Sequence, residues 1–176
     1  VEDFDGDGRL EVVLQAGRAA QPYGATVMVS LDDGRLLWRY EVEPVSYEWY
    51  LYTGHYLPHS KTSQILVIMQ GYPPDKGFGF VALFACSTPG ASPSQKWRFD
   101  FDRYPCFPGL FKVDLDGDAI EELAFETHSH IWFLDALTGK PRQYLDWDVS
   151  PANVRSYGLN RFMDVNGDGL KDFVVI

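Results

Sequence analysis

Three acidic, glycine-containing stretches repeat in this chain and constrain its fold more than any other feature. They occupy residues 3–11, 114–122 and 164–172 and superimpose without gaps. Each has Asp or Asn at its first, third and fifth positions, Gly at its fourth and an acid at its ninth, and an apolar run follows. A single such stretch is commonly an exposed turn, because Asp and Gly are favoured turn residues. Three copies in one register predict a shared role for the side chains.

The spacing of these oxygen-bearing side chains is typical of a metal-binding loop. Calcium takes six to eight oxygen ligands, and short acids separated by small residues can surround it within one loop. The predicted ligands are the side chains of Asp3, Asp5, Asp7 and Glu11 with the Arg9 carbonyl, those of Asp114, Asp116, Asp118 and Glu122 with the Ile120 carbonyl, and those of Asp164, Asn166, Asp168 and Asp172 with the Leu170 carbonyl. The sequence therefore predicts up to three calcium ions, which we call the ions of loops 1, 2 and 3.

Two alternatives fit the loops less well. An EF-hand requires flanking helices and a Glu at position 12, where this chain has Leu14, Phe125 and Val175. Magnesium keeps several of its waters and seldom accepts an all-protein cage. Within the calcium interpretation, Ala119 replaces a glycine that loops 1 and 3 share, so loop 2 is expected to be strained.

The spacing of the loops predicts a fourth copy that has lost its acids. The interval between loops 1 and 2 is about twice that between loops 2 and 3, which places the missing copy near residue 56. The apolar run 64–71 aligns with the run 11–17, and residues 56–63 contain no acid. We expect this copy to keep its strand and to bind no metal.

A second pattern recurs in phase with the loops. Runs of alternating apolar and polar residues that end on an aromatic residue occur in three segments. These segments are 27–38, 80–84 together with 96–97, and 131–144, and their final aromatic residues are Trp38, Trp97 and Tyr144. An Asp-Gly or Thr-Gly pair separates the runs of the first and third segments, so the pattern predicts β-hairpins in which the three aromatic residues occupy matching positions. Sustained helical periodicity is not apparent.

Four strands in each period of about 50 residues indicate a β-propeller blade. The chain is predicted to be all-β, with four-stranded antiparallel blades at 1–43 (first strand missing), 44–102, 103–149 and 150–176 (last two strands missing). A closed ring needs four to eight blades. We therefore expect a portion of a larger propeller, completed by further blades or by a second chain.

The loops and the strands after them resemble FG-GAP or VCBS repeats, which form the propeller of integrin α-subunits. Tyr157-Gly158 before loop 3 matches the aromatic-Gly part of that repeat, and Pro108-Gly109 before loop 2 keeps only the Gly. The hairpin at 134–139 also resembles quinoprotein-type propeller repeats. The FG-GAP resemblance implies ions that stiffen loops on one face, in adhesion proteins, secreted proteins or domains attached to polysaccharide-degrading enzymes.

Charge and hydropathy narrow the possible functions. The net charge of −10, from 25 acidic and 15 basic residues, argues against a nucleic-acid partner. There is no run of 18 apolar residues and no signal peptide at the first residues. Cys86 and Cys106 leave both a disulfide and two thiols open.

The preferred functional hypothesis is a non-enzymatic, calcium-stabilised module that binds a protein or glycan outside the cell, at the cell surface or in the periplasm. Millimolar extracellular calcium would fill loops of modest affinity. The alternative is a portion of a propeller enzyme such as a rhamnogalacturonan-type lyase.

Two further residue groups have open interpretations. His128 and His130 would point the same way on a strand, as metal ligands or as polar residues of one sheet face. The aromatic stretch with Tyr47, Trp49, Tyr50, Tyr52, His55 and Tyr56 fits either core packing or a sugar-binding platform. No nucleophile and base pair and no phosphate-binding loop stand out.

Overall fold

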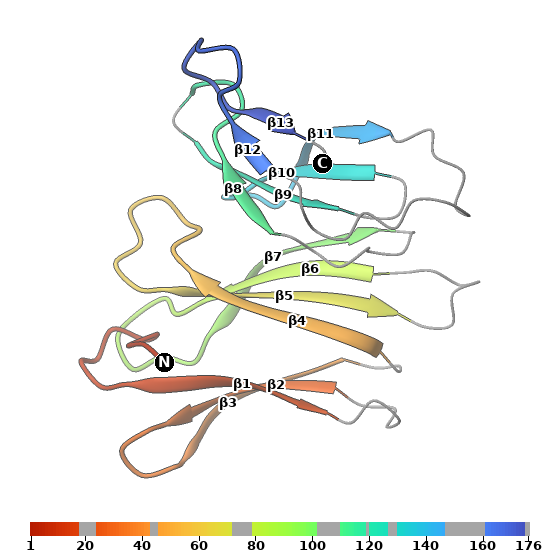
Figure 1. The fold of residues 1–176 in the computed structure, drawn as a ribbon. Coiled ribbons are helices and arrows are strands. Elements are labelled where there is room, and N and C mark those ends of the chain that lie inside the picture. Colours follow the sequence, from red (N-terminus) through yellow and green to blue (C-terminus); the bar gives the residue numbers. More distant parts are fainter. Residues whose placement is uncertain are drawn as a thin grey trace. The chain divides into compact units, whose positions relative to one another are not determined.

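The described part of the chain consists of strands and loops. The computed structural model describes residues 1–17, 24–42, 46–71, 79–101, 110–118, 120–126, 130–146 and 161–174. Within these ranges every regular element is a β-strand, and every strand pairing is antiparallel (Figure 1). The prediction of an all-β chain with antiparallel sheets is confirmed.

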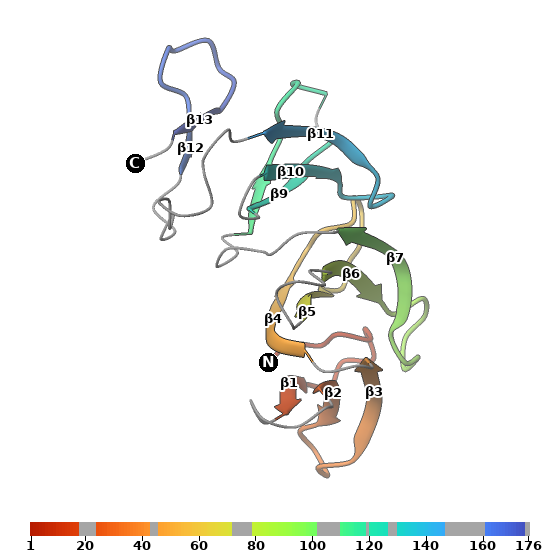
Figure 2. The same ribbon diagram turned by 90° about the vertical axis from the view of Figure 1, so that its right-hand side faces the viewer.

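The strands form four sheets in which chain neighbours are hydrogen-bonded neighbours. The first sheet contains β1 (Glu11–Gly17), β2 (Gly24–Ser30) and β3 (Leu36–Val42), and the second contains β4 (Ser46–Gly54), β5 (Gln64–Gly71), β6 (Gly79–Ala85) and β7 (Ser94–Phe101). The third contains β8 (Phe111–Val113), β9 (Glu122–Glu126), β10 (His130–Asp135) and β11 (Pro141–Asp146), and the fourth contains β12 (Arg161–Met163) and β13 (Asp172–Val174). Figure 2 shows the consecutive strands side by side in each sheet.

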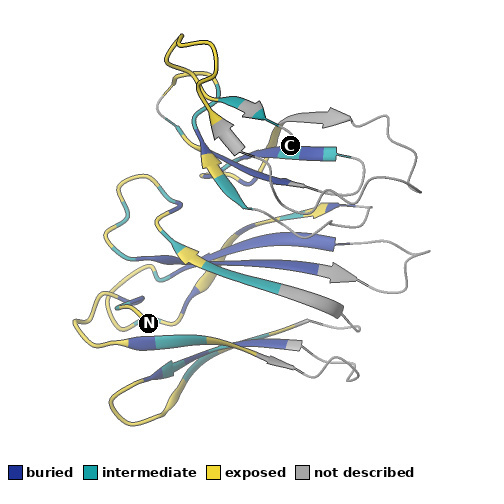
Figure 3. Ribbon diagram, in the orientation of Figure 1, coloured by how far each residue is buried: buried dark blue, intermediate teal, exposed yellow. Residues whose placement is uncertain are grey.

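The first compact unit spans Val1–Asp102 and holds the first two sheets. Its core lies between them, because Phe4 and Met28 from the first sheet region pack with Ile65, Phe80 and Phe84 from the second. The side chains of β6 are buried along the whole strand (Figure 3). Continuous burial explains why β5 and β6 read as unbroken apolar runs rather than as alternating ones.

The second compact unit spans Arg103–Ile176 and holds the third and fourth sheets. Its buried cluster contains Val113, Ala124, Ile131 and Phe133 from β8, β9 and β10. Loop 2 joins β8 to β9, and loop 3 joins β12 to β13. In both cases the acidic loop connects a pair of neighbouring antiparallel strands.

The three predicted hairpins are β2–β3, β6–β7 and β10–β11, and each contains an irregularity at the same place. The register shifts between Met28 and Val29, between Leu83 and Phe84, and between Phe133 and Leu134. The shift leaves one extra residue on the partner strand, as in a β-bulge. The extra residues are Leu37, Lys96 and Arg142.

This register corrects one sequence-based alignment. Trp38 and Trp97 do occupy matching positions next to the shift, opposite Met28 and Leu83. The matching position in β11 is Gln143, whereas Tyr144 pairs one residue further on, with Trp132. The two turns have the same length, but Trp38 follows the turn glycine Gly34 by four residues and Tyr144 follows Gly139 by five, so aligning the aromatic residues shifted the third hairpin by one. The finer prediction, that the sheets are propeller blades at 1–43, 44–102, 103–149 and 150–176, stays a prediction.

Candidate metal centres

The three acidic loops share one hydrogen-bonded scaffold. In each loop the carboxylate at position 9 accepts the N–H of position 2, with distances of 2.9 Å for Glu11 to Phe4, 3.1 Å for Glu122 to Leu115 and 3.0 Å for Asp172 to Val165. The side chain at position 1 also accepts a hydrogen bond from the backbone N–H of position 4. The side chain at position 3 accepts one from the N–H of position 5, and the side chain at position 5 accepts one from the N–H of position 7. The common sequence spacing thus corresponds to a common loop conformation.

Glycine is required at the fourth position of this scaffold. Gly6, Gly117 and Gly167 have φ angles of 77°, 75° and 80°, in the left-handed region that side chains disfavour. Gly8 and Gly169 adopt φ angles of 90° at the sixth position. Ala119, where we expected strain, lies outside the described residues.

Loop 1 brings three of its predicted ligands together. Carboxylate oxygens of Asp3, Asp5 and Glu11 all lie within 4.8 Å of one another. Asp5 and Glu11 are buried, and Glu11 is only 2% exposed. Asp7 and Arg9, also predicted ligands, lie on the exposed side of the loop, where the Arg9 N–H donates to Asp7 at 2.8 Å.

The electrostatics of loop 1 favour a bound cation. Burial raises the pKa of Glu11 above its usual value, and the charges of Asp5, Asp3 and Asp7 raise it further. The Arg9 guanidinium lies 3.7 Å from Asp32 in the turn after β2. A buried carboxylate among like charges is costly unless a positive charge compensates it.

Loop 2 has a similar triplet, formed by Asp114, Asp116 and Glu122, whose oxygens lie within 4.8 Å of one another. Glu122 is 2% exposed, and burial raises its pKa as it does for Glu11. The predicted ligand Asp118 accepts the Ile120 N–H at 2.7 Å, which lowers the pKa of Asp118.

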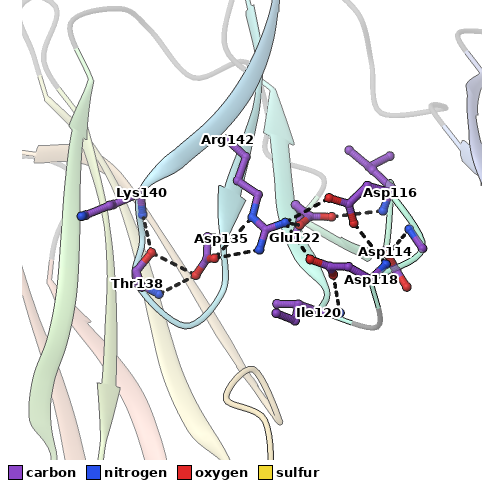
Figure 4. A network of polar contacts seen from close by, with 11 residues as sticks. Asp114, Asp116, Asp118, Ile120, Glu122, Asp135, Thr138, Lys140 and Arg142 are labelled. Carbon is purple, nitrogen blue, oxygen red and sulfur yellow. Dashed lines mark hydrogen bonds and ion pairs between the residues drawn. The ribbon is translucent and has the colours of Figure 1, made fainter.

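Arg142 from β11 extends its guanidinium into loop 2 (Figure 4). Its Nη1 lies 3.2 Å from Asp116, 3.1 Å from Asp118 and 3.2 Å from Glu122 Oε1. Its Nη2 lies 3.1 Å from Asp135. Glu122 Oε1 makes no hydrogen bond, so its contact with Arg142 is an ion pair of imperfect geometry.

Loop 3 is the most exposed of the three. Asp164, Asn166 and Asp168 are exposed, and Asp172 is half-buried. The Asn166 Nδ2 donates to Asp168 Oδ2 at 3.0 Å, and the Leu170 N–H donates to Asp168 Oδ1 at 2.8 Å. Loop 3 has the scaffold of the others, but its acids do not form a close triplet like those of loops 1 and 2 among the described residues.

The fourth copy keeps the ninth-position hydrogen bond of this scaffold, with an amide in place of the acid. Gln64 is fully buried, and its Oε1 accepts the Leu57 N–H at 2.9 Å, as Glu11 accepts that of Phe4. Its Nε2 donates to Ser60 Oγ at 2.7 Å and to the Thr62 carbonyl. The amide hydrogens therefore satisfy oxygens inside a loop that contains no acid.

Arg142 is the residue that sequence reasoning missed. It is 24 residues from Asp118 and 26 from Asp116, and it lies in a hairpin rather than in a loop. Counting from the turn glycines Gly34 and Gly139 aligns Arg142 with Leu37, but the sequence alone does not show that a bulge lies there and that the side chain reaches the loop.

The other candidates receive limited support. His130 stacks on Trp132 with ring centroids 5.5 Å apart, and His128 lies outside the described residues. Tyr56 is buried, and burial raises its pKa to about 12, which fits core packing. Burial also raises the pKa of Cys86 to about 12, and Cys106 lies outside the described residues.

Comparisons with known proteins add no family assignment. No protein-family model matches the sequence, and no curated protein matches it. Among the residues that the structure describes, none belongs to a helix that could cross a lipid bilayer.

Proposed function

We propose that this chain is a calcium-stabilised β-propeller segment that serves as an interaction module rather than as an enzyme. The observation that carries the calcium proposal is the triplet of loop 1, where Asp3, Asp5 and a Glu11 that is 2% exposed converge within 4.8 Å. The described contacts of these three carboxylates are N–H donors of their own loop. A divalent cation would compensate their charges.

Calcium suits this donor set better than other common ions. The side chains offer only hard oxygen ligands, which favour calcium, magnesium or manganese over zinc or copper. A flexible loop that supplies most ligands from its own side chains suits the variable coordination of calcium, whereas magnesium demands near-ideal octahedral geometry.

A repeated contact between neighbouring loops supports the propeller proposal. A methyl group built on Gly6 would lie 3.1 Å from Thr62 Cγ2, and one built on Gly117 would lie 3.4 Å from Leu170 Cδ2. In both units, therefore, the fourth position of one loop meets the seventh position of the loop in the next sheet. A repeated relation between successive sheets is expected of blades arranged around an axis.

The proposed interaction role rests on the same loops. Ions that hold the loops of successive blades in place would stiffen the rest of the module, which would then bind a protein or glycan outside the cell. We place it there because extracellular calcium is millimolar, enough to fill loops of modest affinity. Remaining blades, or a second chain, would close the ring.

The calcium proposal is tested by isothermal titration calorimetry on the full chain. We expect calcium to bind in preference to magnesium, and the variant Asp3→Asn to lose one site. Glu41→Gln is a matched control, because Glu41 is an exposed acid paired with Arg39 away from the loops. The calcium proposal fails if Asp3→Asn titrates like the unmodified chain.

The interaction role is tested separately by screening the calcium-loaded chain against arrays of glycans and extracellular proteins. We expect the calcium-loaded chain to bind at least one class of ligand, and we expect the variant Asp3→Asn to lose this binding. If no ligand binds the calcium-loaded chain, the proposed role as an interaction module is wrong.

A further inference from the structure

The hairpin bulges of the first and third sheets place different residues near loops 1 and 2. In the first sheet the bulge residue is Leu37, which lines the same pocket as Asp5 and supplies no charge. In the third sheet it is Arg142. The residue paired with the ninth position of the loop also differs, since Glu11 pairs with Ser30 and Glu122 pairs with Asp135.

Arg142 and Asp135 form a matched pair that the first sheet lacks. Asp135 accepts hydrogen bonds from Arg142 Nε at 3.3 Å and Nη2 at 3.1 Å, while Nη1 is directed to the loop. The carboxylate of Asp135 thereby orients the guanidinium. The Nη1 atom is left nearly equidistant, at 3.1–3.2 Å, from three loop carboxylates. Asp116 and Glu122 belong both to this set and to the candidate metal-binding triplet, so a bound ion would compete with Nη1 for their carboxylates.

We propose that Arg142 is the resident cation of loop 2, so that this loop is neutralised by the chain itself and binds calcium only when the guanidinium leaves. This inference rests on the proposed calcium binding of the acidic loops. It reduces the number of loops that bind calcium readily from three to two, which are loops 1 and 3. Loop 2 stays ordered without metal, whereas loop 1 depends on it.

The fourth copy gives an independent precedent for replacing an ion with a side chain. There Gln64 removes the buried charge at the ninth position and supplies amide hydrogens to loop oxygens. In loop 2 the charge is kept and a guanidinium compensates it. The ninth-position hydrogen bond therefore occurs in three settings: acids whose described hydrogen bonds come from N–H groups of their own loop, acids paired with an arginine, and a neutral amide.

The test isolates loop 2 in the full chain. Asp3→Asn and Asp164→Asn disable loops 1 and 3, and calcium affinity is then measured with Arg142 present and in Arg142→Leu, which introduces the residue of the first sheet. We expect Arg142→Leu to bind calcium at least about tenfold more tightly, because no charge-assisted contacts have to be broken first. Unchanged or weaker binding would overturn the proposal.

A matched control separates the local effect from the loss of one positive charge. Arg39→Leu removes an arginine that is paired with Glu41, away from the acidic loops. We expect Arg39→Leu to change the calcium affinity of loop 2 by less than about twofold, because exposed charges are screened by salt. An equal gain in both variants would show a net-charge effect and refute the specific role of Arg142.

A metal-free measurement distinguishes this inference from the calcium proposal itself. In EDTA, Arg142→Leu is expected to melt at a lower temperature than Arg39→Leu, because Asp116, Asp118 and Glu122 lose the guanidinium that is paired with them. This result is expected even if loops 1 and 3 bind no calcium, and equal melting temperatures would contradict the proposal.

A measurement on the unmodified chain covers the case in which Arg142→Leu does not fold. The Arg142 Nε–H signal in NMR, assigned with Arg142→Lys, should stay unchanged at calcium concentrations that fill loop 1 and move only at higher ones. If the signal moved together with the filling of loop 1, or not at all once loop 2 was filled, Arg142 would not be the resident cation.

Discussion

At the scale of single residues, the side chain at the ninth position of each loop is central to the proposed chemistry. Glu11, Glu122 and Gln64 all accept the N–H of the second loop residue from a buried site. The hydrogen bond alone therefore does not require an acid. The acid is needed only if the site also holds a cation.

This comparison predicts the behaviour of Glu11→Gln. The amide keeps the acceptor for the Phe4 N–H but removes a buried charge, so we expect the metal-free chain to gain about 1 kcal/mol in unfolding free energy. The calcium response of loop 1 should be lost. Urea unfolding with calcium and with EDTA measures both effects, with Glu41→Gln as the exposed control. A calcium response in Glu11→Gln equal to that of the parent chain would count against the assignment.

The pH dependence of stability also follows from these residues. Burial raises the pKa of Glu11 and of Glu122 above the usual 4.5. Each binds more protons folded than unfolded, so the metal-free unfolding free energy should rise as the pH falls from 7 toward 4.5. Asp33 and Asp118 have pKa values lowered by backbone N–H donors, and their contribution is lost only below about pH 3.8.

Calcium should reverse this trend, because protons compete with the ion for the same carboxylates. Urea unfolding at pH 7 and pH 5, in EDTA and in calcium, measures the two slopes. The account predicts a rise in stability toward pH 5 in EDTA and a fall in calcium. Slopes of equal sign in the two conditions would contradict it.

At the scale of elements, the hairpin bulge determines which side chain of the sheet lies near the loop. A bulge redirects the side chain of the extra residue. Because it recurs at the same register in β2–β3, β6–β7 and β10–β11, Leu37, Lys96 and Arg142 are equivalent by position and different in chemistry. Lys96 donates to Ser87 Oγ at 2.9 Å, in a sheet whose loop has no acid.

The contact between loop 1 and the fourth copy predicts the effect of Gly6→Ala. A β-carbon at Gly6 meets both an unfavourable φ of 77° and the Thr62 methyl group at 3.1 Å. We expect Gly6→Ala to cost about 1–3 kcal/mol of unfolding free energy, more than Gly90→Ala, whose φ is 73° and whose surroundings are open. Thr62→Ser should recover the difference, as urea unfolding of the double variant would show. Equal costs at Gly6 and Gly90 would refute the contact.

The sequence predicted these elements well where local chemistry decides them. Asp-Gly and Thr-Gly turns located two hairpins, and the acid spacing located loops whose backbone hydrogen bonds prove equivalent. Alignment with Glu11 also identified Gln64 at its structural position. The sequence did not locate the bulges, because these depend on pairing between strands. Arg142 was missed for the same reason.

At the scale of the whole molecule, loop 1 is connected to the core of its unit through Phe4. Phe4 is the second loop residue, its N–H is bound by Glu11, and its side chain is 1% exposed within the cluster between the first two sheets. An ion that fixes Glu11 would therefore also fix a core side chain. For this reason calcium is expected to stabilise the fold and not only a surface loop.

The most direct test of the central claim is thermal unfolding of the full chain in calcium and in EDTA. Calcium at about 100 times its dissociation constant contributes about 2.7 kcal/mol for one site, which corresponds to about 5–10 °C in melting temperature for a chain of this size. The account predicts such a shift for the parent chain and its loss when Asp3→Asn and Asp164→Asn are combined. An equal melting temperature in calcium and in EDTA would contradict it.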